Sequence, residues 1–129
     1  MRTVVITGSN RGIGAAVART LIKQGQRLCL AVRDPKSLSG TDLDPDLSPD
    51  RLMSCPYDAR VPEDAQRLVE TTLNRFGSLD TLIHCAGILH RTPLLFSEEQ
   101  RAEPDELWSV NVMGPWWLTR AAWPALVDS

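Results

Sequence analysis

The sequence lacks most features that mark membrane, secreted or nucleic-acid-binding proteins. None of its apolar runs approaches the length of a membrane span, and segment 1–7 is too short to be a secretory leader. The formal net charge is only −2, and basic residues are scattered among acidic ones, so there is no electrostatic footprint for nucleic acid or an anionic membrane. These absences favour a cytoplasmic protein whose partner is a small molecule.

Residues that build disulfides, metal sites and proton relays are also scarce. Cys29, Cys55 and Cys85 lie far apart in apolar runs, which predicts reduced core thiols rather than a disulfide framework. His84 and His90 have no other donors at ligand spacing, so we predict no metal site and a structural role for both. Lysine occurs twice and tyrosine once, which restricts the acid–base chemistry available within these residues.

Strand patterns alternate with helix patterns along the chain. The β-branched run Thr3–Thr7 is typical of a strand buried on both faces, and apolar residues recur at helical spacing after Gly12. Short linkers between such elements predict right-handed crossovers and a parallel sheet. We expect strands at Arg2–Thr7, Arg27–Val32, Leu52–Cys55 and Leu79–Cys85, and helices at Gly12–Gln24 and Pro62–Phe76.

These elements predict an α/β fold, a Rossmann-like doubly wound parallel sheet that is incomplete, with about four strands and flanking helices. One domain would cover residues 1–129. Segment Asp34–Asp50 is rich in Pro, Ser and Asp and predicts an irregular loop with at most one helical turn. Segment Pro104–Val127 is apolar around much of its circumference, so as a helix it must bury more than one face. Pro115 and Pro124 are expected to kink or divide it.

A glycine-rich turn stands where the first strand ends and the first helix begins. Gly8 permits a tight turn, Gly12 lets the backbone approach a pyrophosphate, and Gly14 allows close packing of the helix. The free amide groups and the helix dipole would face the negative charge of the ligand. This arrangement predicts dinucleotide binding by Gly8, Ser9, Asn10, Arg11, Gly12, Ile13 and Gly14.

The spacing Gly-x-x-x-Gly-x-Gly after Thr7 resembles the short-chain dehydrogenase/reductase family. Further matches follow in the family's order at Asp58, at 84–87 and at 111–114, so the resemblance runs from residue 2 to about 126. It implies a nicotinamide-dependent oxidoreductase that interconverts a small-molecule alcohol and carbonyl, with a homo-oligomeric parent. The alternatives are a dinucleotide-binding module without catalysis and an inert truncated fragment.

The resemblance also assigns further cofactor contacts. Asp58 would hydrogen-bond the adenine, although such an aspartate can instead cap a helix or form a turn. In the family's Asn-Asn-Ala-Gly segment both asparagines are replaced here, by His84 and Cys85, so Cys85 would contribute its backbone only. The resemblance adds Asp58, Ala59, Cys85, Ala86 and Gly87 to the predicted cofactor site.

Asn111 matches the family asparagine that holds a water in the proton relay to a catalytic lysine. Amid apolar residues we expect it to be buried and to need hydrogen-bond partners, whether for that relay or for a helix irregularity near Pro115. The family's catalytic serine and Tyr-x-x-x-Lys pair do not occur in these residues, since Tyr57 is followed four positions later by Val61. The resemblance therefore indicates a chain truncated before the catalytic residues, and we expect the isolated chain to be inactive.

The end of the second strand bears on the choice of cofactor. An acid there selects NAD(H), and counting about twenty residues from the glycine turn points to Asp34. Alignment with the family instead places Val32 at the position of the acid, and Asp34 before Pro35 is typical of a turn. Arg33 and Arg11 could both bind a 2′-phosphate, which favours NADP(H) and leaves NAD(H) possible.

Overall fold

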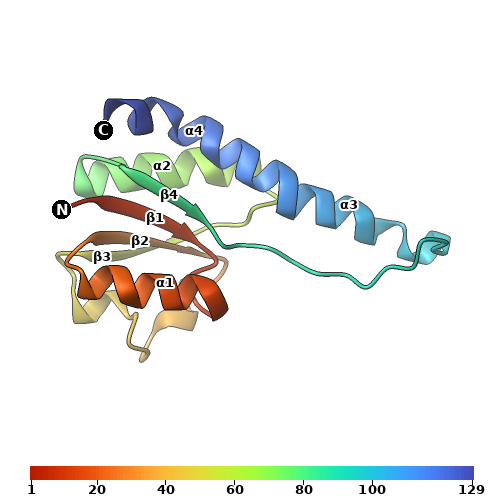
Figure 1. The fold of residues 1–129 in the computed structure, drawn as a ribbon, viewed down its shortest axis with the longest axis horizontal. Coiled ribbons are helices and arrows are strands. Elements are labelled where there is room, and N and C mark those ends of the chain that lie inside the picture. Colours follow the sequence, from red (N-terminus) through yellow and green to blue (C-terminus); the bar gives the residue numbers. More distant parts are fainter.

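Four parallel strands form the centre of the computed structural model, which describes residues 1–129. In spatial order they are β3 (Leu52–Pro56), β2 (Arg27–Val32), β1 (Thr3–Thr7) and β4 (Thr81–His84), as Figure 1 shows. The predicted parallel α/β sheet is therefore confirmed. Each crossover connection brings the chain back to the end of the sheet where the strands begin. All four strands therefore run in the same direction, and their carboxyl ends lie together.

Strand burial follows position in the sheet. β1 pairs with β2 on one side and β4 on the other, and all five of its residues are buried. β4 is paired along one edge only, and its residues are half-buried or exposed. The unpaired edge is what the incomplete sheet predicted from the sequence would have.

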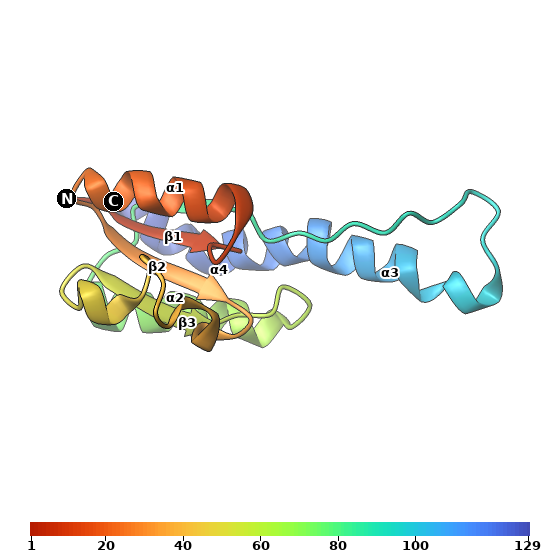
Figure 2. The ribbon, with the colours of Figure 1, turned by 90° about the horizontal axis from the view of Figure 1, so that it is seen from below.

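Helices cover both faces of the sheet. Helix α1 (Gly12–Lys23) lies on one face, and α2 (Pro62–Phe76) and α4 (Gly114–Asp128) lie together on the other (Figures 1 and 2). Successive strand residues point to opposite faces, so Val4 and Ile6 enter the core under α1 while Val5 enters the core under α2 and α4. Two cores on one sheet make the fold doubly wound.

Helix α2 begins and ends at the signals that the sequence contains. Pro62 occupies its first turn with Glu63 and Asp64, and Gly77 ends it with a left-handed φ of 79°.

The loop between β2 and β3 is more ordered than the sequence predicted. It has two 3₁₀ turns, Pro35–Leu38 and Pro45–Leu47, rather than at most one. Its Leu38 and Leu43 are buried in the core under α1, which holds the loop against the sheet.

The apolar segment Pro104–Val127, which holds all four tryptophans of the chain, is helical without a break. Helix α3 (Ala102–Trp108) passes into a π-helical turn, Ser109–Met113, and then into α4. Of the two expected effects of Pro115 and Pro124, a kink or a division of the helix, division does not occur. Pro115 falls in the first turn of α4, directly after the π turn, and Pro124 lies inside α4.

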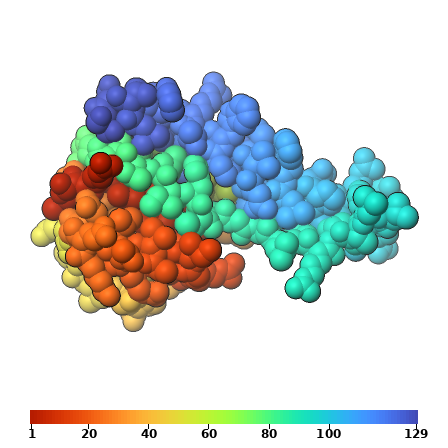
Figure 3. Space-filling view, in the orientation of Figure 1, coloured from red at the N-terminus to blue at the C-terminus, as the bar shows by residue number.

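An arm extends away from the sheet between β4 and α3. Residues 85–97 contain no helix or strand and run beside α3 to the far end of the molecule (Figures 1 and 3). At its tip, Ser97 and Gln100 form a capping box at the short 3₁₀ helix Glu98–Gln100. None of the helices has the length and apolar character needed to cross a lipid bilayer.

Candidate dinucleotide-binding site

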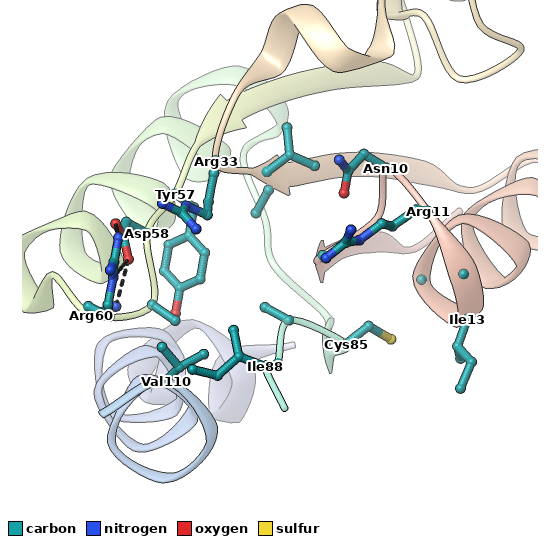
Figure 4. A pocket seen from close by; sticks show the side chains of 18 of the residues that line it. Asn10, Arg11, Ile13, Arg33, Tyr57, Asp58, Arg60, Cys85, Ile88 and Val110 are labelled. Carbon is teal, nitrogen blue, oxygen red and sulfur yellow. Dashed lines mark hydrogen bonds and ion pairs between the residues drawn. The ribbon is translucent and has the colours of Figure 1, made fainter. Parts of the chain in front are cut away.

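A cavity of about 350 Å³ opens at the carboxyl ends of the four strands. Its size falls in the range of small-molecule sites, and its place is where ligands bind in open parallel sheets. Figure 4 shows side chains from the glycine turn, the ends of β2 and β3, and the segment after β4 converging on it. The predicted residues that line it are Gly8, Asn10, Arg11, Gly12, Ile13, Gly14, Arg33, Asp58, Ala59, Cys85, Ala86 and Gly87.

Ser9 is the one predicted cofactor residue that does not line the cavity. Its side chain is fully buried, and its hydroxyl oxygen has no hydrogen-bond partner. The hydroxyl therefore points into the protein. Any contact of Ser9 with a cofactor would come from its backbone, and that contact stays a prediction.

The three glycines of the turn serve different steric needs. Gly8 has a φ of 63°, and a Cβ there would lie 2.7 Å from the backbone nitrogen of Ala86. At Gly14 a Cβ would clash with the Gly8 carbonyl oxygen, so helix α1 could not begin this close to the turn. Gly12 has a φ of 58° with nothing within 4 Å of the Cβ position, so the space beside it is open to a ligand.

The turn after β4 is held by Thr7 rather than by asparagine side chains. The Thr7 hydroxyl oxygen accepts hydrogen bonds from the backbone N–H groups of Cys85 and Ala86, both at 3.1 Å. Nε2 of His84 lies 3.0 Å from the Thr119 hydroxyl on α4, and partial desolvation lowers the pKa of the imidazole. The structural role of His84 stays a prediction. All three cysteines are free, with two buried and Cys85 half-buried.

Asp58 stands in a tightly organised turn at the end of β3. One carboxylate oxygen accepts from the backbone N–H and Nε of Arg60, at 2.9 and 3.0 Å, and the other accepts from Nη2 at 2.8 Å. The Arg60 guanidinium lowers the pKa of Asp58. The backbone N–H of Asp58 donates to Asp64 at 2.9 Å. Asp58 is thus a turn aspartate whose ionised carboxylate also lines the cavity, and its contact with adenine stays a prediction.

Asn111 is exposed, so the expectation that it is buried is wrong. Its side chain nevertheless has the partners that were expected: Nδ2 donates to the carbonyl of Ile88 and Oδ1 accepts from the backbone N–H of Ile88, both at 2.9 Å. These two bonds fasten the segment after Gly87 to the π turn. The residue does not line the cavity, and its part in a proton relay stays a prediction.

Several lining residues were not identified from the sequence. Tyr57 and Arg60 flank Asp58, and Ile88 follows Gly87, so proximity to a motif was their only signal. Glu106 and Val110 come from α3 and the π turn, and no local pattern places them at the sheet. The Glu106 carboxylate lies 4.0 Å from the Arg60 guanidinium, so this ion pair connects the Asp58 turn to α3, and Nε2 of His90 lies 3.7 Å from the same carboxylate.

Two arginines of the cavity make no hydrogen bond or ion pair through their guanidinium groups. Arg11 projects from the glycine turn and Arg33 from the end of β2 (Figure 4). Arg33 also lines a neighbouring polar hollow with Asn10 and Ser37. Asp34, the nearby acid, accepts from the backbone N–H of Lys36 at 3.0 Å and begins a 3₁₀ turn, as the Asp-Pro pattern predicted. The two guanidinium groups at this end of the cavity are therefore available to bind an anion.

Comparisons with known proteins agree with this geometry. The family described as short chain dehydrogenase matches residues 2–129. An L-fucose dehydrogenase of Mus musculus is 35% identical over 99% of this chain and 45% of its own length. An 11-beta-hydroxysteroid dehydrogenase A of Sesamum indicum is 35% identical over 99% of this chain and 37% of its own.

A solved short-chain dehydrogenase/reductase from Brucella melitensis, titled a glucose/ribitol dehydrogenase, has the same fold. It superposes with a TM-score of 0.86 at 34% identity, covering 97% of this chain and 52% of that one. The chain thus spans about half the length of the proteins it matches.

Proposed function

Because the chain belongs to the short-chain dehydrogenase family, we propose that it supplies the cofactor-binding part of an NADP(H)-dependent oxidoreductase that interconverts alcohols and carbonyl compounds. The observation that carries the cofactor assignment is the pair of unpartnered guanidinium groups, Arg11 and Arg33, in the cavity at the strand ends. Both are free to take an anionic ligand without first breaking an internal ion pair. When bound, the nicotinamide would supply the hydride chemistry, and these residues would hold the other end of the molecule.

The distribution of acids supports the phosphorylated cofactor over NAD(H). The position where an NAD-selecting acid would stand is Val32, which is buried. The carboxylate of Asp34, the first acid after β2, is engaged by the backbone of its own turn. No carboxylate at the end of β2 is therefore free to accept from a ribose 2′-hydroxyl, whereas a guanidinium fork is suited to a 2′-phosphate.

Substituting Arg33 tests this assignment. Arg33→Ala is expected to weaken NADPH binding by roughly tenfold or more and to leave NADH nearly unchanged, because a charge-assisted contact is worth about 1.5–3 kcal/mol. Cofactor fluorescence titration measures both affinities. Arg91→Ala is a matched control, since Arg91 is an exposed arginine of the arm without an ion pair. If the unmodified chain binds NADPH and NADH equally, the preference for NADP(H) is wrong.

The helical segment also supports a homo-oligomeric parent. The expectation that it buries more than one face is not met within this chain, because α4 buries only Gly114, Leu118 and Ala122. Trp116, Trp123 and Val127 follow one another at intervals of seven and four residues and are mostly exposed. An apolar stripe of this kind is covered by a partner in most soluble proteins, and we infer a second copy.

Charge placed on this stripe should break the association. Trp116→Glu is expected to shift the chain from dimer to monomer in sedimentation velocity, because an ionised carboxylate would have to be buried without a partner. Leu95→Glu, at an exposed apolar residue on the arm tip, serves as the control and should leave the dimer unchanged. A chain that is monomeric at high concentration before any substitution would contradict the inference.

A further inference from the structure

The single tyrosine of the chain lies in the wall of the cavity. Tyr57 follows the last residue of β3, and only 4% of it is exposed. Its ring packs in the core under α2 and α4 and also lines the cavity. In Figure 4 the ring stands beside Arg33 and Asp58, and its hydroxyl points toward the side of the cavity formed by Ile88 and Val110.

The Tyr57 hydroxyl is an unused hydrogen-bond donor. No protein group hydrogen-bonds it, although the neighbouring polar groups of Asp58, Arg60 and Asp64 are all paired. Burial, followed by the charges of Asp64 and Asp58, raises the pKa of the phenol to about 12. The group therefore keeps its proton at neutral pH and can donate it in a hydrogen bond.

The hydroxyl of a largely buried tyrosine usually finds a hydrogen-bond partner, and that of Tyr57 has none within the protein. Because Tyr57 lines the cavity, a ligand bound there can accept from this hydroxyl. Beside it stand apolar walls, Ile88 and Val110, and within the same turn the Asp58 carboxylate, which accepts hydrogen bonds. A flat ring that offers an acceptor nitrogen next to a donor amino group matches this combination, and adenine is such a ring.

We propose that Tyr57 is a specificity-determining residue of the cofactor site, whose hydroxyl donates a hydrogen bond to a ring nitrogen of the adenine. This inference rests on the proposed dinucleotide-binding function and adds a second side chain, beside Asp58, to the recognition of the base. Arg33 and Arg11 recognise the phosphate on the ribose, and Tyr57 recognises the base. The two contributions are separable because they act on different parts of the ligand.

The test uses Tyr57→Phe, which removes one oxygen atom and no protein–protein hydrogen bond. Isothermal titration calorimetry would measure the affinities of the original chain and of the variant for 5′-AMP, 2′,5′-ADP and inorganic pyrophosphate. Tyr57→Phe should weaken the binding of 5′-AMP and of 2′,5′-ADP by the same factor, roughly three- to tenfold for the loss of one neutral hydrogen bond. The affinity for pyrophosphate should stay unchanged. Arg33→Ala is the matched comparison, since it should weaken 2′,5′-ADP and spare 5′-AMP.

A second readout reports on the hydroxyl itself. With one tyrosine in the chain, ¹³Cζ-labelled tyrosine gives a single NMR resonance. This resonance should shift on addition of 5′-AMP and stay in place with pyrophosphate.

The outcomes separate the two proposals. Unchanged affinity of Tyr57→Phe for 5′-AMP, or an equal loss for pyrophosphate, would overturn the role of Tyr57 and leave the cofactor assignment standing. If the unmodified chain binds neither 2′,5′-ADP nor NADPH, the proposed function itself fails.

Discussion

Replacing Gly12 by valine is expected to abolish dinucleotide binding while the chain stays folded. The Cβ position of Gly12 has no neighbour within 4 Å, so an added Cβ meets no protein atom and extends into the space beside the start of α1. A pyrophosphate would occupy that space in order to reach the free N–H groups of the helix. Loss of two charge-assisted contacts weakens binding by about 10²–10⁴-fold.

Gly40→Val is the control that isolates this steric effect. Gly40 also has a positive φ, 75°, and open space at its Cβ position, but it lies in the loop between β2 and β3 and does not line the cavity. Both substitutions impose a left-handed conformation on a branched residue, which costs about 1–2 kcal/mol of stability. Urea unfolding should show similar losses in the two variants, and NADPH titration should show lost binding in Gly12→Val alone. Unchanged NADPH affinity in a folded Gly12→Val chain would mean that the glycine turn is only structural.

The second large expected effect is that the chain of 129 residues shows no turnover of alcohols or carbonyl compounds. Short-chain dehydrogenases are expected to use a serine and a Tyr-x-x-x-Lys pair, and this chain has no such pair, because Tyr57 is followed by Val61 at the fourth position. Burial raises the pKa of the Tyr57 phenol to about 12, and no lysine stands four residues later to lower it, so we do not expect Tyr57 to replace the family's tyrosine. General acid–base catalysis contributes about 10²–10⁴ in rate, and substrate positioning contributes more. NADPH absorbance with a panel of ketones, aldehydes and secondary alcohols should therefore stay flat.

Asn111→Ala distinguishes this account from a chain with its own proton relay. Both side-chain groups of Asn111 bind the backbone of Ile88, so its removal should change no activity in this chain and should lower turnover in a full-length parent. Reproducible turnover that disappears in Asn111→Ala would refute the account. A parent reading frame that lacks the serine and the Tyr-x-x-x-Lys pair would favour a binding module over an enzyme.

The sequence by itself determined the elements and placed most of the predicted cofactor residues around one cavity. Backbone sterics act locally: a glycine at a left-handed φ, a β-branched run before it and a helical repeat after it specify the unit from β1 to α1 whatever the rest of the chain does. Alternating strands and helices then permit few topologies, so the parallel sheet followed. In the same way Asp34 before Pro35 predicted its turn.

Only the tertiary structure decided how side chains from distant segments share the site. The partner of Asn111 is Ile88, 23 residues earlier, and Glu106 on α3 lines the cavity at the strand ends although it is far from every strand in the sequence. Ser9 turned inward and Tyr57 turned toward the cavity, although each stands beside a motif residue that the sequence identified. Local patterns encode periodicity and backbone conformation, whereas the direction of a side chain depends on which helix packs over it, and that packing is set by contacts far apart in the chain.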